Sequence, residues 1–176
     1  MTLPRTLTPA REAVESALTT STGETLSLAS SGGLFQLLPP AAGTARGVAL
    51  KAKPGVWVSF EGITSGPLLL QSDRHQLALT AKIVVSYWSG DPKNPTETVA
   101  LQRAFEADVP RMKLALTCSP ALEHAPDGSE TGITGLALLD KGWTSTGPEP
   151  WPIEVGGPRV VRVTHRFPFL VELSTT

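Results

Sequence analysis

Residues 76–88, QLALTAKIVVSYW, decide the fold, because their apolar and polar side chains alternate. One side of the alternation holds Leu77, Leu79, Ala81, Ile83, Val85 and Tyr87. The other side holds Gln76, Thr80, Lys82 and Ser86. A period of two residues predicts a β-strand with one face on a core and the other in water. At about 3.3 Å per residue this strand runs for roughly 40 Å, which is long for a globular protein.

A second stretch with the same period lies near the C-terminus, at residues 160–173. Its apolar side holds Val161, Val163, His165, Phe167, Phe169, Val171 and Leu173. The residues that alternate with them are Arg162, Thr164, Arg166, Pro168 and Glu172. Because proline has no N–H for the strand ladder, we expect Pro168 at a sheet edge or at a bulge. Two long amphipathic strands therefore frame the chain.

Two segments carry helix signals. Thr8 followed by Pro9 predicts the start of a short helix, whose apolar face holds Ala10, Ala13, Val14, Ala17 and Leu18. A longer helix is predicted after Asn94, which can cap it, and its apolar stripe comprises Leu101, Phe105, Val109, Met112 and Leu116. Pro110 lies within the stripe, so we expect a kink there or two consecutive helices. The alternation in Arg111–Cys118 also fits a strand, but the stripe crosses Pro110 in phase and favours the helix.

Shorter strands are predicted at Glu24–Ala29, Val48–Lys51, Val56–Phe60 and Ile133–Leu139, with a break at Gly62–Pro67. Long loops are expected at about residues 30–55 and 140–158, where glycine and proline are frequent. The pattern predicts a single α+β domain over residues 1–176. Its mostly antiparallel twisted sheet carries the main helix, kinked near Pro110, and the short N-terminal helix on one face.

The composition restricts the classes of function. The chain has 176 residues, a formal net charge of −1 and a pI of about 6.3, so it lacks the basic surplus typical of nucleic-acid binding. Cys118 is the only cysteine, which excludes an intrachain disulfide and a cysteine-based zinc site. No apolar run resembles a secretory signal or approaches the ~20 residues of a membrane span. We expect a protein made in the cytoplasm, without membrane contact.

Candidate catalytic residues have simpler structural interpretations. Asp73–Arg74–His75 stands at a strand start, where consecutive side chains do not share a face. His165 falls on an apolar face, where a buried histidine bonded to a backbone group is the simpler interpretation. Ser30–Gly33 lacks the lysine of a phosphate loop, and Cys118 has no context that would lower its pKa. We therefore expect no catalytic residues, no metal ligands and no cofactor, and a protein that is not an enzyme.

Four residues are candidates for a subunit or partner interface: Trp143, Trp151, Arg162 and Arg166. The two tryptophans lie in the long loop expected at 140–158, where they could anchor a partner subunit or pack the loop onto its own sheet. The two arginines lie on the polar face of the closing strand. They could be solvated there, or contact a neighbouring ring or passing DNA.

The order of these features resembles a family of phage proteins. The first long strand ends in Tyr87–Trp88, and a D-P-x-N-P loop follows at Asp91–Pro95. The helix then reads E-x-x-A-L-x-x-x-F-x-x-D from Glu97, and the closing strand reads V-x-V-x-H-x-F-x-F from Val161. This layout is similar to that of the tail-terminator and related neck proteins of tailed bacteriophages.

The resemblance implies an α+β subunit that assembles into a ring, typically a hexamer, in the tail or neck of the virion. Such a ring caps the tail tube, stops its polymerisation and joins it to the head connector, while DNA passes through without specific binding. The family has no catalytic motif, so no site residue carries over. The long loops leave open whether the chain is a terminator or another neck or tail-completion protein. The alternative is a small soluble ligand-binding or enzymatic domain with a pocket between sheet and helix.

Overall fold

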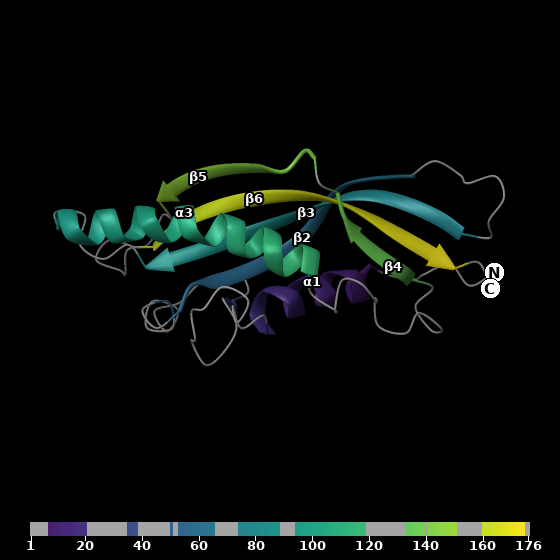
Figure 1. Ribbon diagram of the computed structural model, residues 1–176, viewed down its shortest axis with the longest axis horizontal. Helices are drawn as coiled ribbons and strands as arrows, with labels where there is room; N and C mark the ends of the chain where they lie inside the picture. Colours follow the sequence, from purple (N-terminus) through teal and green to yellow (C-terminus); the bar gives the residue numbers. More distant parts are fainter. Residues whose placement is uncertain are drawn as a thin grey trace.

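The computed structural model describes residues 7–20, 35–38, 50, 53–65, 74–88, 94–118, 133–139, 141–150 and 160–174. These residues form the helices α1 (Thr8–Thr20) and α3 (Pro95–Cys118). They also form the strands β1 (Gln36–Leu37), β2 (Gly55–Ser65), β3 (Arg74–Trp88), β4 (Ile133–Leu138), β5 (Thr144–Pro150) and β6 (Val160–Ser174). Figure 1 shows α3 in front of the long strands and α1 below them.

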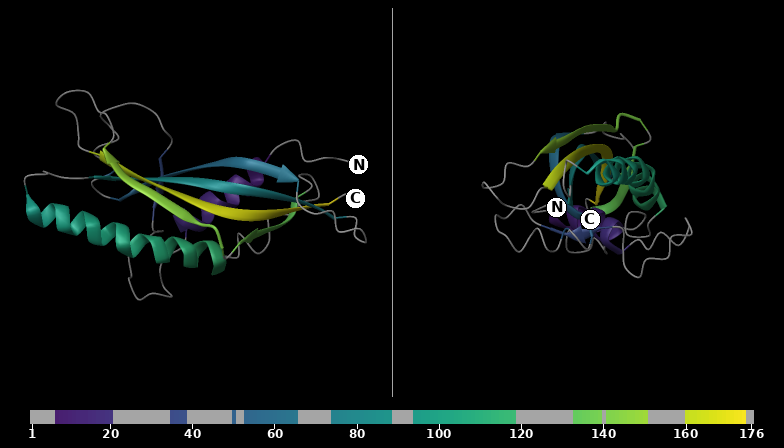
Figure 2. Two further views of the ribbon diagram at one scale, coloured as in Figure 1. Left: turned by 90° about the horizontal axis from the view of Figure 1, so that it is seen from above. Right: turned by 90° about the vertical axis from the view of Figure 1, so that its left-hand side faces the viewer.

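The strands form one six-stranded sheet in the order β1-β2-β3-β6-β4, in which β5 also pairs with β6. All neighbouring strands are antiparallel except β1 and β2, which are parallel. The prediction of an α+β fold is therefore confirmed, and the mostly antiparallel sheet is in detail a mixed one. The sheet is curled rather than flat (Figure 2), as expected from the twist that L-residues impose on strands.

The two strands predicted to frame the chain lie side by side. β3 and β6 pair along their whole lengths, from Arg74 opposite Ser174 to Trp88 opposite Val160. The predicted apolar faces meet in this register: Ile83 lies opposite His165 and Val85 opposite Val163, and all four residues are buried. One core cluster includes this face together with buried residues of both helices. Both helices therefore pack on the apolar face of the sheet, and the alternation seen in the sequence separates that face from a polar one.

α3 continues through Pro110 as one helix, so the alternatives of two helices and of a strand at Arg111–Cys118 are wrong. Proline removes one backbone hydrogen bond and crowds the preceding turn. The side chain of Pro110 is exposed, whereas Met112 and Leu116 in the next turns are buried in the core. Tertiary packing of these turns offsets the local cost of the proline.

Pro168 lies opposite Thr80 of β3, away from any register shift, and on its other side it falls in the gap between the β4 partner Phe169 and the β5 partner Arg166. The carbonyl of Pro168 accepts a hydrogen bond from the backbone N–H of Leu139, at 2.9 Å. In a strand the N and C=O of one residue point to the same side. The missing N–H of Pro168 therefore points toward Leu139, so the reciprocal bond of this pair is absent, and β4 ends at Leu138.

Two predicted breaks contain strand structure. The range 140–158, expected to be a loop, includes β5, which pairs with the first half of β6. β2 continues through Gly62 to Ser65, because Gly62 adopts a φ of 63° and a register shift follows Glu61. Such a glycine-containing irregularity lets a strand continue after one extra residue. Leu50, predicted in a strand, has helical backbone. The predicted strand at Glu24–Ala29 lies outside the described residues.

Candidate functional sites

Trp143 packs on its own sheet. Its ring stacks on Phe167 with 6.0 Å between centroids and 13° between planes, while 37% of the residue stays exposed. Phe167 itself is fully buried, so Trp143 covers one end of the core from the turn before β5. This contact favours the interpretation in which the tryptophan holds its own segment in place. Trp151 lies outside the described residues.

The two predicted interface arginines lie on the opposite face of β6 from Phe167, because residues of even and odd number alternate along the strand. Arg166 donates from Nε to Oε1 of Glu61 at 2.5 Å, across the intervening strand β3. The structure thus separates Trp143 from Arg162 and Arg166, and it engages Arg166 within the chain.

The arginines belong to a larger surface, which we call the polar face. It comprises Ser59, Glu61, Thr80, Lys82, Arg162, Thr164 and Arg166, all partly exposed. Lys82 stands directly opposite Arg166 in the register of β3 and β6. The sequence predicted the arginines but assigned no role to Lys82 or Glu61. Lys82 and Glu61 lie near the arginines only because β2, β3 and β6 pair, and the spacing of residues along the sequence does not reveal which strands pair.

His165 contacts a serine hydroxyl rather than the backbone group expected for it. Its Nδ1 lies 2.6 Å from Oγ of Ser145, its direct partner on β5. The predicted burial is confirmed, with 1% of the residue exposed. Burial disfavours the charged imidazolium and lowers the pKa of His165 to about 4.

A serine beside a histidine is also the geometry of an activated nucleophile. Such a base works best with a pKa near the operating pH and with a third group that orients it. In the described part of the chain, Ser145 makes the polar contact of His165, and the pKa of about 4 makes this imidazole a weak base near neutrality. The pair therefore fits a tether between β5 and β6 better than a catalytic dyad.

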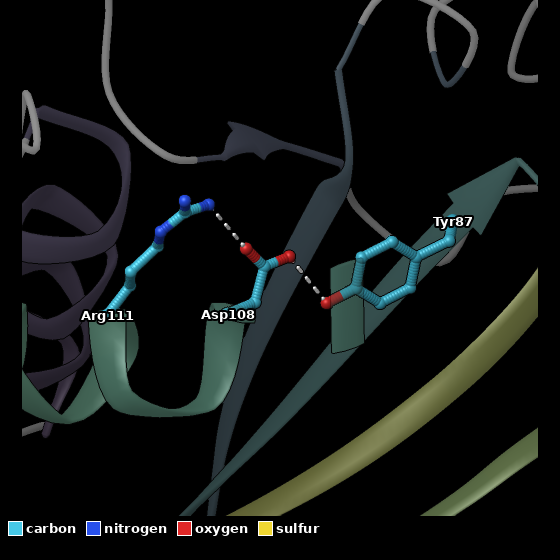
Figure 3. A network of polar contacts seen from close by, with 3 residues as sticks. All are labelled: Tyr87, Asp108 and Arg111. Carbon is cyan, nitrogen blue, oxygen red and sulfur yellow. Dashed lines mark hydrogen bonds and ion pairs between the residues drawn. The ribbon is translucent and has the colours of Figure 1, made fainter. Parts of the chain in front are cut away.

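A third polar site lies between α3 and the end of β3 (Figure 3). The hydroxyl of Tyr87 donates to Oδ2 of Asp108 at 2.9 Å, and Arg111 donates from Nη1 to Oδ1 at 3.4 Å. Tyr87 and Asp108 are buried. The ring of Phe105 meets that of Tyr87 edge-on, with 4.7 Å between centroids. These contacts attach the middle of α3 to the sheet at one angle.

The electrostatics of this site reflect its burial. Desolvation raises the pKa of Asp108, although the hydrogen bond from Tyr87 and the charge of Arg111 act in the other direction. Desolvation also raises the pKa of Tyr87, and the neighbouring Asp108 adds to this effect. Sequence analysis missed the site. The available signal was the position of Asp108, which lies between Phe105 and Met112 on the buried side of the helical stripe.

The other candidates from the sequence lie at the ends of described elements or outside the described residues. The described residues contain no group of three or more histidine, cysteine or acidic side chains that could hold a metal ion. Cys118 ends α3, and Arg74 and His75 begin β3. Asp73 and Ser30–Gly33 lie outside the described residues. Neither described helix has the length and apolar character needed to cross a bilayer.

No protein-family model matches the chain. A search of curated proteins likewise finds no match.

Proposed function

We propose that the chain is a structural subunit that assembles into a homo-oligomeric ring, a hexamer by its resemblance, in the tail or neck of a bacteriophage. The ring would cap the tail tube, stop its polymerisation and contact the head connector. The observation that carries the proposal is the division of the sheet. The described helices pack on its apolar face, whereas the polar face stays partly exposed over strands of 15 residues.

The lengths of β3 and β6 suit a subunit that forms part of the wall of a ring. A strand of 15 residues spans about 50 Å at ~3.3 Å per residue, and β3 and β6 remain paired over that length. A ring subunit needs a rigid surface of this kind on which neighbours or passing DNA can lie. The net charge of −1 suits a channel that lets DNA pass without gripping it.

The polar sites described above act within the fold. Asp108 binds α3 to β3, and Ser145 joins β5 to β6 through His165. Both sites stiffen the subunit and leave the polar face and the start of α3 as surfaces. This division of roles supports an assembly protein, whose function depends on shape and surface.

Measuring the mass of the purified chain by native mass spectrometry, alone and with tail tubes, tests the proposal. We expect a closed ring, or a monomer that forms a ring on the end of a tube and stops its elongation. A chain that stays monomeric at every concentration and leaves tube growth unchanged would refute the assignment.

The alternative is an enzymatic domain, and the contact between Ser145 and His165 is the observation on its side. A fluorophosphonate probe, which labels activated serines, tests this alternative directly. Labelling that disappears in Ser145→Ala but persists in Ser59→Ala would favour the enzyme. We expect no labelling that depends on Ser145, because the pKa of His165 is about 4 and leaves it a weak base.

A further inference from the structure

The first turns of α3 are exposed on all sides, and the turns that follow place Leu101, Ala104 and Phe105 against the core. Every residue from Pro95 to Ala100 is exposed, and so are Gln102, Arg103 and Glu106. Figures 1 and 2 show this end of the helix projecting beyond the sheet in two perpendicular views. Isolated helical turns are marginal in water and normally gain their stability from packing. A projecting helix end is therefore a surface suited to a partner.

The projecting turns are held in shape by their own cap. The side chain of Asn94 accepts from the backbone N–H of Thr96 at 3.1 Å and donates to Glu97 at 3.1 Å. This arrangement satisfies one backbone donor at the helix start without help from the core. The helix end is consequently preformed, which lowers the conformational cost of docking.

The exposed end of α3 carries more acidic than basic residues and one exposed apolar residue. Between Pro95 and Glu106 it carries the acids Glu97 and Glu106 and one base, Arg103. Val99 lies among them with 48% of its surface exposed. The projecting end is therefore mildly acidic with an apolar residue at its centre, a combination that fits a basic partner surface.

The polar face has the opposite charge balance. Lys82, Arg162 and Arg166 are basic, and Glu61, the acid among its seven members, is bound by Arg166. Glu149 of β5 lies opposite Arg162 in the register, so a positive balance remains when this acid is included. Arg162 lies near the start of β6, opposite Ser86 near the end of β3, at the end of the sheet from which α3 projects, and Lys82 lies at the middle of β3. The helix lies over the apolar face, so the acidic and basic surfaces are on opposite sides of the sheet.

We propose that the projecting half of α3, Pro95–Glu106, docks on the polar face of a second copy of this chain. Two different surfaces on opposite sides of one subunit make a head-to-tail contact, which closes into a ring when the rotation allows. The inference deepens the proposed function and rests on it, because it names the surfaces through which copies of the chain would meet.

Charge reversal on each surface tests the docking. The helix variant is Glu97→Lys with Glu106→Lys, and the sheet variant is Lys82→Glu with Arg162→Glu. Like charges now face each other when either variant meets itself, so we expect its self-association to weaken about tenfold or more. In an equal mixture the reversed helix meets the reversed face and each native surface meets its native partner. The mixture should therefore recover assembly as a ring in which the two variants alternate. A single chain that carries all four changes should also assemble, as a ring of identical copies.

The recovery separates docking from simple unfolding. Loss of the Asn94–Glu97 contact could loosen the helix start, but a looser helix would not be rescued by changes on the sheet. Glu12→Lys, an exposed acid on α1, is the matched control and should assemble like the wild type. The readouts are native mass and far-ultraviolet circular dichroism for every variant.

Two results would overturn the inference, and they are distinguishable. Wild-type rings with both variants assembling normally, or with no recovery on mixing, would refute this docking and leave the ring intact. A wild-type chain that remains monomeric under all conditions, with and without tail tubes, would refute both the docking and the proposed function.

Discussion

The two halves of α3 belong to one helix but are held by different forces. The second half is attached to the core through Asp108, Met112 and Leu116, all buried. The first half begins at a cap, Asn94, is exposed on all sides up to Ala100, and then places Leu101, Ala104 and Phe105 against the core. Burial therefore decides where the helix lies, and local hydrogen bonds maintain its exposed first turns, Pro95–Ala100. The contrast indicates that the second half serves the fold and the first half is available for assembly.

The largest expected effect is the loss of core packing in the second half of α3. Leu116→Ala should lower the free energy of unfolding by about 2–5 kcal/mol, because it leaves a cavity in the core. Val99→Ala removes two methyl groups from an exposed position and should change stability by less than about 0.5 kcal/mol. Urea unfolding of the two variants measures the difference. Equal losses would show that the projecting half is also packed in the folded subunit.

A pH titration tests the buried interior against the exposed surfaces. The pKa of His165 is about 4 in the folded chain against an ordinary value of 6.5, so the unfolded chain takes up a proton first as the pH falls. Stability should decline between pH 6.5 and about 4, by about 3 kcal/mol in all, and this contribution should be constant below that range. His165→Gln should flatten this part of the curve. A profile unchanged by the substitution would show that the imidazole is accessible to solvent.

The attachment of the second half can be weakened at one hydrogen bond. Tyr87→Phe keeps the ring contact with Phe105 but removes the hydroxyl that donates to Asp108, at an expected cost of about 1–2 kcal/mol. Thermal or urea unfolding measures this loss. Because Tyr87 is the chain's single tyrosine, tyrosinate absorbance provides a control. The absorbance should stay low beyond the ordinary pKa of 10.0 until the protein unfolds, and ionisation near that value would contradict the burial.

The smallest expected effect on stability is that of removing the Asn94 cap at the start of α3. Asn94→Ala removes the side-chain bonds to Thr96 and Glu97, so hydrogen exchange in Pro95–Ala100 should quicken. The free energy of global unfolding should change by less than about 0.5 kcal/mol, because the exposed turns are weakly coupled to the core. Asn94→Asp retains a capping oxygen and should preserve slow exchange. A large global loss in Asn94→Ala would show that the projecting half supports the fold.

Much of the fold could be predicted because the necessary signals are local. Period-two alternation predicted both long strands, and helical spacing with caps predicted both described helices. The interface candidates were less accessible to this approach, since Trp143 proves to stack on Phe167 and Arg166 to bind Glu61. Both contacts join residues that are distant along the chain, and no spacing rule reports such pairs.

The sequence by itself determined which segments are amphipathic and which face of each is apolar, because periodicity depends only on neighbouring residues. Only the tertiary structure decided that TSTGPEP is a strand, since β5 is defined by its pairing with β6. It also decided that α3 crosses Pro110 unbroken and that Asp108 meets Tyr87. In each case the free energy comes from contacts between distant segments, which outweigh the local preference of the chain.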